Sequence, residues 1–313
     1  MTATQGPVPV RISPDDRLPA AARARSDAPL LRLGAVEVLS GQFKTFTSSA
    51  DEISVDAVLA SAAIPTLFRS VQVGSGVYWD GLFSQNPPVT QLISSLPDEI
   101  WVVQINPTRI EREPKTVSEI ANRRNELAGN LSLYQELGFI EHLDHFLETG
   151  AVSAGAAQPV TVRVLEMDRP ASSTRWGYAS KLNRDPDFIT ELIDLGVAQT
   201  ETFLTALGFE QAWLSGEAEQ VLAYCDEGTT VCARGRVAHC EPTDDPGRVR
   251  AFIRDRLADT LRVERSRKRI CRGRVSWEIR QDGTADRAHA VARFEDGMLR
   301  DLRIDDEPDW SPL

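Results

Sequence analysis

The stretch YWDGLFSQNPPV, residues 78–89, places one carboxylate where it could do chemistry. Asp80 ends an apolar run, and Gly81 and Leu82 follow it at a corner that leads into Asn-Pro-Pro. A side-chain carboxylate that is shielded from water can take up a proton from a nearby hydroxyl. Asp-Gly is also among the commonest turn dipeptides, so a purely structural interpretation stands beside the chemical one. The stretch predicts a site at Asp80 whose reaction partner must be sought elsewhere.

Other polar side chains give weaker signals. His142 and His145 are three residues apart in EHLDH, a spacing that permits metal ligation, but the acids between them are typical of a solvated helix face. Asn86 is interpreted as a helix cap rather than as a ligand. The four cysteines lie in the last third and form no C-x-x-C pair, so reduced, packed thiols are expected. We predict no metal site and no cofactor.

Composition and charge narrow the classes of function. With 42% hydrophobic and 26% charged residues, the chain has a globular composition, and 313 residues suffice for two domains. A net charge of −11 argues against a nucleic-acid partner. We find no apolar run of the roughly 20 residues that a membrane span needs and no leader-like apolar segment. The cytoplasm is therefore the predicted location.

The first two thirds of the chain alternate predicted strands with predicted helices, a pattern typical of an α/β layered domain. Ser54 is a predicted cap for a short helix with Ala57, Val58 and Ala62 on its apolar face, and a further helix is predicted from Pro87. The capping box TVSE begins a long helix. The predicted strands are 30–38, 43–47, 66–73, 77–79, 99–106 (buried on both faces) and 159–167, and the long helices are 116–148 and 185–207.

The pattern changes near Leu207-Gly208. Helices are predicted over 210–225 and 244–261, followed by strands at 261–271, 274–280, 287–295 and 298–305. Asp-Gly pairs separate the last three strands, which favours hairpins. Trp213, Trp277 and Phe294 are expected in the core of this part. We predict a poorly ordered lead-in at 1–28, an α/β domain at 29–208 and a small α+β domain at 209–313.

Residues 59–89, LASAAIPTLFRSVQVGSGVYWDGLFSQNPPV, resemble the second conserved block of the patatin-like phospholipases, which reads ASxAxP, an aromatic strand, D-G-[GA] and N-x-P. The similarity extends over about residues 30–207 and implies part of a three-layer α/β/α domain. Residues from about 210 onward resemble, more weakly, the cone-shaped nuclear-transport-factor-two-like fold, of the polyketide-cyclase-like sort.

The resemblance implies a serine acyl hydrolase with a Ser–Asp dyad, in which Asp80 is the base, and a lipid or acyl-ester substrate. It also leaves peripheral association with a membrane open. The chain departs from the family at Leu82, where Gly or Ala is usual, and it carries no G-x-S-x-G. The looser match AVSAG, residues 151–155, lacks the strand–turn–helix context of a nucleophile elbow.

Two hypotheses follow. In the first, the chain is the C-terminal half of a patatin-like domain, lacks the nucleophile and oxyanion loop, and is inactive alone; the missing half then binds in trans, or the exposed edge self-associates. In the second, the chain is a non-catalytic remnant whose C-terminal domain binds a small ligand or a partner.

Overall fold

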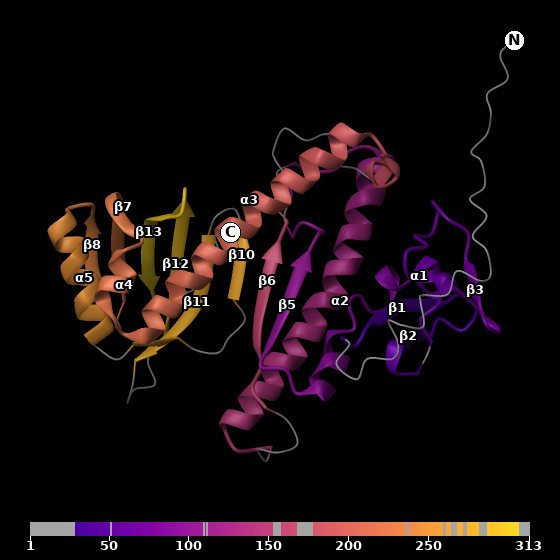
Figure 1. Ribbon diagram of the computed structural model, residues 1–313, viewed down its shortest axis with the longest axis horizontal. Coiled ribbons are helices and arrows are strands. Elements are labelled where there is room, and N and C mark those ends of the chain that lie inside the picture. Colours follow the sequence, from indigo (N-terminus) through magenta and orange to yellow (C-terminus); the bar gives the residue numbers. More distant parts are fainter. Residues whose placement is uncertain are drawn as a thin grey trace, which may run out of the picture. The chain divides into compact units, whose positions relative to one another are not determined.

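The computed structural model gives the arrangement of most of the chain (Figure 1). The lead-in predicted for 1–28 lies outside the described residues. The structure describes residues 29–50, 52–108, 110, 112–152, 158–167, 178–235, 238–258, 261–263, 268–271, 274–281 and 287–306.

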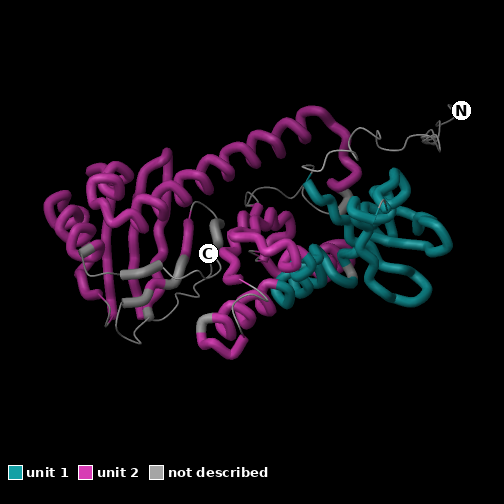
Figure 2. Tube along the Cα trace, turned by 60° about the horizontal axis from the view of Figure 1, so that its bottom comes forward, with its two compact units in different colours: residues 1–91, 127–136 teal, residues 92–126, 137–313 magenta. Residues whose placement is uncertain are grey.

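The chain divides into two compact units, which Figure 2 shows in teal and magenta. Unit 1 comprises residues 1–91 and 127–136, and unit 2 comprises residues 92–126 and 137–313. Helix α2, Val117–Glu148, contributes its middle to unit 1 and both of its ends to unit 2. The domain boundary predicted at 208/209 falls inside unit 2 and stays a prediction.

Unit 1 is built on an antiparallel sheet with the strand order β2-β1-β4-β3. Strands β2, β3 and β4 are rich in β-branched and aromatic residues, which favour extended backbone, and Gly74, with φ of 59°, allows the tight β3–β4 turn. Its core joins Ala35, Phe46 and Ile53 to helix α1. The strands are β1 Arg32–Glu37, β2 Phe43–Thr47, β3 Val71–Val73 and β4 Gly76–Asp80.

Helix α1, Val55–Ser61, confirms the predicted cap, because the Ser54 hydroxyl accepts the Ala57 N–H at 3.1 Å. Its buried face was predicted only in part. Ala57 and Ala60 are buried, whereas Val58 is 44% exposed. The helix is short and small side chains face the sheet, so the strands approach closely and leave the larger valine outside.

The helix predicted to begin at Pro87 is wrong. The Asn86–Pro87 peptide is cis, and a 3₁₀ helix, η4, begins only at Val89 and ends at Ser95. Pro87 itself precedes a second proline, and the ring of Pro88 disfavours helical geometry at the residue before it.

Unit 2 contains a mixed sheet in which nine strands pair among the described residues. Parallel pairing joins β5 to β6, β6 to β10, and β13 to β7, while β11, β12 and β13 form the predicted antiparallel meander. The order is β5-β6-β10-β11-β12-β13-β7-β8, with β9 beside β11. The strands are β5 Glu99–Gln104, β6 Thr161–Glu166, β7 Cys225–Arg234, β8 His239–Thr243, β9 Leu261–Val263, β10 Lys268–Cys271, β11 Arg274–Gln281, β12 Arg287–Glu295 and β13 Met298–Asp305.

Strand β5 corrects the prediction that residues 99–106 are buried on both faces. Ile100, Val102 and Gln104 are buried, but Trp101 and Val103 on the opposite face are 54% and 68% exposed. β5 is also the terminal strand of its sheet in the described part of the chain. An apolar run indicates a strand, but it does not indicate whether a second layer covers it.

The long helix predicted over residues 116–148 is confirmed at both ends as α2, whereas the helices predicted over 185–207 and 210–225 differ from the structure. Thr116 and Glu119 form the predicted capping box of α2. The buried face of α2 carries Leu133, Leu137 and Ile140, whereas Ile120, Leu127 and Leu131 are more than half exposed. Helix α3 runs from Pro186 to Ser215 without a break at Gly208, followed by α4 Ala218–Leu222 and α5 Pro246–Ala258.

Helices α3, α4 and α5 cover one face of the C-terminal strands in unit 2 (Figure 1). Phe209 lies at the centre of this core and makes edge-on ring contacts with Tyr224 and Phe294. Trp213 and Phe294 are buried as predicted, and the side chain of Trp277 lies outside the described part. The Asp296-Gly297 hairpin is confirmed, with φ of 53° and 75°; the Asp282-Gly283 pair lies outside the described residues. No helix among the described residues is both long and apolar enough to span a bilayer.

Candidate functional site

Asp80 is the last residue of β4, at the point where the sheet of unit 1 ends. It pairs with Ala35 of β1, and its backbone N–H donates to the Ala63 carbonyl at 3.0 Å. Its Oδ1 accepts the Leu82 N–H at 3.0 Å and so caps the short 3₁₀ turn η3, Gly81–Phe83. The carboxylate is partly buried. Strand and turn together fix its direction.

Gly81 is required by the packing of this corner. A Cβ at this position would lie 3.3 Å from the Gly34 carbonyl carbon and 3.3 Å from the Phe43 ring. These distances are tighter than ordinary van der Waals contact, so the turn approaches β1 more closely than a side chain would allow. Leu82, which follows, is only 5% exposed and serves as a packing residue.

Hydrogen bonds to α2 hold the loop that follows Asp80. Glu136 accepts the Thr90 N–H on Oε2 at 2.6 Å and the Gln85 side-chain amide on Oε1. Ser132, one turn earlier, accepts the Asn86 N–H at 2.9 Å. Both acceptors are 8% exposed. Asn86 therefore bonds through its backbone to another helix, and its predicted role as a cap of its own helix is wrong.

These two acceptors were missed from the sequence. Ser132 and Glu136 lie one helical turn apart in a polar stretch, NLSLYQE, that reads as ordinary solvated helix. Their spacing of four puts them on one face. Nothing in the sequence, however, links that face to a loop 46 residues earlier.

The sequence offers Ser153 as a candidate nucleophile for Asp80. Ser153, in the looser AVSAG match, lies outside the described residues. The two histidines whose spacing permits metal ligation lie on α2. His142 and His145 are exposed, and His142 Nδ1 lies 2.7 Å from the Gly138 carbonyl oxygen. In the described part of the chain, no three His, Cys, Asp or Glu side chains gather as a metal site would require.

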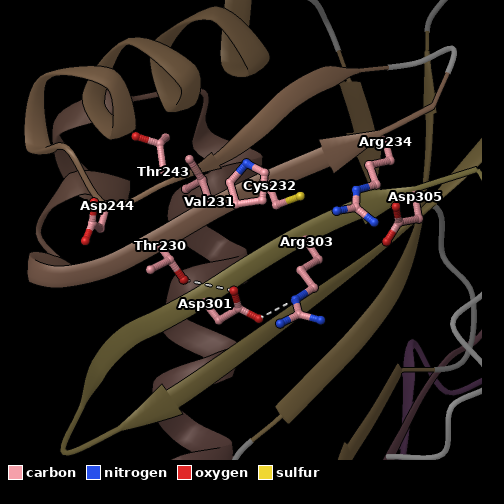
Figure 3. A pocket seen from close by; sticks show the side chains of 10 residues that line it. Thr230, Val231, Cys232, Arg234, Thr243, Asp244, Asp301, Arg303 and Asp305 are labelled. Atoms are coloured by element: carbon pink, nitrogen blue, oxygen red, sulfur yellow. Dashed lines mark hydrogen bonds and ion pairs between the residues drawn. The ribbon is translucent and has the colours of Figure 1, made fainter.

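A second candidate site is a pocket of about 480 Å³ on unit 2 (Figure 3). It lies on the face of β7 and β13 opposite the helices, because most of its lining residues on these strands alternate with the buried Ala233, Leu302 and Ile304. The lining residues are Thr230, Val231, Cys232, Arg234, Pro242, Thr243, Asp244, Asp301, Arg303 and Asp305.

The pocket is polar and mixed in charge. Asp301 accepts the Thr230 hydroxyl at 2.9 Å and pairs with the Arg303 Nε at 2.8 Å, as Figure 3 shows. Arg234 and Asp305 are paired in the strand register beside them. Burial raises the pKa of the Cys232 thiol, so it is poorly suited as a nucleophile. This arrangement can bind a small polar ligand through its charges and hydroxyls.

Sequence reasoning missed this pocket because it missed β7 and β8. The stretch TTVCA begins with three β-branched residues, a composition that favours a strand and could have indicated β7. The described cysteines 225, 232 and 240 are free thiols, as expected.

Comparison with protein families gives one match, which lies in the N-terminal part of the chain. A family model described as patatin-like phospholipase matches residues 20–93, which include Asp80 and the corner around it. No curated protein matches the chain.

Solved structures resemble a third of the chain at low overall similarity. A designed protein with a curved β-sheet is 12% identical, covers 36% of this chain and 88% of its own, and has a TM-score of 0.28. An NTF2-like protein of unknown function from Cytophaga hutchinsonii is 16% identical, covers 33% of this chain and 87% of its own, and has a TM-score of 0.27. An NTF2-like protein from Burkholderia xenovorans is 13% identical, covers 34% of this chain and 88% of its own, and has a TM-score of 0.26. The family-model match confirms the resemblance predicted from residues 59–89: residues 20–93 are similar to the patatin-like phospholipases, a lipid hydrolase family.

Proposed function

We propose that this chain is the C-terminal part of a patatin-like acyl hydrolase in which Asp80 is the base of a Ser–Asp dyad. The observation that carries the proposal is the placement of Asp80 at the end of β4, oriented by the Leu82 N–H within the segment that matches the family. The substrate class is a lipid or another acyl ester. The nucleophilic serine lies outside these 313 residues, which carry no G-x-S-x-G, and an upstream reading frame or a separate chain would supply it.

The chemistry assigned to Asp80 is proton transfer. A serine hydroxyl is a weak nucleophile until a base removes its proton. As the serine oxygen bonds to the ester carbonyl carbon, its proton passes to the Asp80 carboxylate. The same proton then leaves with the departing alcohol, which restores the carboxylate. Glu136 and Ser132 support this role by holding the loop that follows the Asp80 corner.

The test is reconstitution. The chain alone should not hydrolyse short p-nitrophenyl esters above the buffer rate. Adding the polypeptide translated from the DNA immediately upstream should restore hydrolysis if that polypeptide carries a glycine-rich loop and G-x-S-x-G. Asp80→Asn should abolish the restored activity, and Asp56→Asn, at an exposed position on α1, should leave it unchanged. Turnover by the chain alone that disappears in Asp80→Asn would overturn the proposal of an external serine.

A second candidate function is ligand binding without catalysis, and the pocket on β7 and β13 is the observation that favours it (Figure 3). In that case the upstream DNA encodes no nucleophile motif. Replacing Arg303 by Ala should then change the affinity for small charged ligands, measured by calorimetry, while Asp80→Asn should not.

A further inference from the structure

Helix α3 exposes an apolar stripe along its length. The stripe consists of Ile189, Ile193, Val197, Leu204 and Leu214, which are 41% to 59% exposed. At about 100° per residue, these positions fall within roughly 100° of the helix circumference. Because the helix rises about 1.5 Å per residue, the stripe is long enough to seat another helix of about 20 residues.

The stripe lies beside a buried face that fixes α3 against the sheet of unit 2. Phe203 and Phe209 belong to the core, and buried Glu210 pairs with Arg163 of β6 at 2.9 Å. These contacts set the orientation of the C-terminal half of α3. The stripe lies on the side of the helix that faces away from the core of unit 2.

The apolar surface continues from α3 onto β5. Trp101 contacts Phe203 edge-on, with ring centroids 5.0 Å apart. Val103 lies on the same face of β5 as Trp101 and is 68% exposed, and Ile105, just beyond the strand, is 56% exposed. An extended apolar area of this kind on one unit is typical of an interaction surface.

The charge on α3 indicates which kind of partner can bind the apolar stripe. The helix contains no Lys, Arg or His, and it exposes Asp187, Glu191, Asp194 and Glu201. The last two lie along one flank of the stripe by helical geometry. A second copy of α3 would bring like charges together, and an anionic lipid surface would be repelled. A helix with basic residues beside its apolar face matches both features.

We propose that the α3 stripe, with the exposed face of β5, binds a basic amphipathic helix of a protein partner. Apolar anchors at helical spacing would pack on Ile193 and Val197, and basic residues beside them would face Asp194 and Glu201. This mode of recognition lays an amphipathic helix along an apolar surface. It is independent of the proposed hydrolase function.

The experiment uses the full chain and two synthetic fluorescent peptides of about 20 residues. Both carry Leu at intervals of three and four; one has Lys and the other Glu at the remaining positions. Fluorescence anisotropy should show binding of the Lys peptide only, weakened about tenfold or more when salt is raised from about 0.05 M to about 0.5 M. Ile193→Ser with Val197→Ser should weaken it about tenfold or more.

Matched control variants distinguish binding at the α3 stripe from nonspecific binding of the peptides. Val117→Ser removes an apolar side chain that is 86% exposed on α2 and should not change the affinity. Asp194→Lys with Glu201→Lys should shift the preference toward the Glu peptide. Circular dichroism checks that each variant is folded.

Several results would overturn the proposal. These are equal binding of the two peptides, binding that survives the Ile193/Val197 double substitution, and a dimer in sedimentation that this substitution abolishes. Binding to phosphatidylserine vesicles that depends on the same two residues would also overturn it, because the occupant would then be a membrane.

Discussion

The backbone N–H of Thr90 donates a 2.6 Å hydrogen bond to Oε2 of Glu136, which lies on α2, 46 residues further along the chain. The other carboxylate oxygen of Glu136 accepts the Gln85 side chain. One buried side chain on a helix thus holds both ends of the loop that follows the candidate catalytic corner.

Glu136→Ala should destabilise the protein by about 2–3 kcal/mol, because it leaves a partly buried backbone donor without its charged acceptor. The free energy of unfolding from urea denaturation measures this. Gln135→Ala, at the neighbouring exposed position of α2, is the matched control and should change stability by less than about 0.5 kcal/mol. Equal effects of the two substitutions would contradict the role of Glu136.

Gly81→Ala should cost about 1–3 kcal/mol, since the new methyl group would press against β1 at Gly34. Gly138→Ala, within α2, adds a methyl group in open space and should instead stabilise by up to about 1 kcal/mol. Thermal unfolding of both variants gives the comparison. A destabilised Gly138→Ala would show that the effect is not specific to the corner.

Arg163→Met should destabilise the protein by about 3–5 kcal/mol, because the buried carboxylate of Glu210 would lose its ion pair with Arg163. Burial lowers the pKa of Arg163, but hydrogen bonds and charges from Glu99 and Glu210 outweigh it and raise that pKa overall. The double variant Arg163→Met, Glu210→Met should recover most of the loss, as chemical denaturation can show. An unchanged loss in the double variant would mean that packing, not charge, is responsible. Arg254→Ala breaks an exposed pair with Glu219 and should cost under about 1 kcal/mol.

Stability should fall at alkaline pH through Cys225. Burial raises the pKa of this thiol from its ordinary 9.0 to about 11. A raised pKa in the folded state means that the stabilising contribution is complete below the pKa of the unfolded state and is lost as pH rises through that of the folded state. The stability advantage of the protein over Cys225→Ala should therefore shrink between pH 9.0 and about 11. A constant difference across this range, measured by urea denaturation, would refute it.

The predicted boundary at 208/209 can be tested with fragments. A fragment of residues 185–313 keeps Phe203 and Phe209, which belong to the core of the C-terminal strands. A fragment of residues 210–313 lacks both and should be less stable by several kcal/mol, since loss of one buried Phe costs about 3–5 kcal/mol. Differential scanning calorimetry distinguishes them. Equal, cooperative transitions would favour the boundary at 208/209.

The sequence determined the local features of this protein. The Ser54 cap, the capping box at Thr116 and the Asp296-Gly297 hairpin depend on residues within a few positions of one another, and each is confirmed. Asp80 and Gly81 were also found from the sequence, because the motif around them is contiguous.

Only the tertiary structure decided which faces are covered and what holds the site. Glu136 and Ser132 reach partners 46 residues away, and one face of β5 is exposed despite its apolar sequence. Gly208 resembles a helix end, yet α3 continues through it, and the absence of a side chain there leaves room for the Tyr224 hydroxyl. Each of these outcomes depends on which distant surface packs against the segment, and that information is not contained in local spacing.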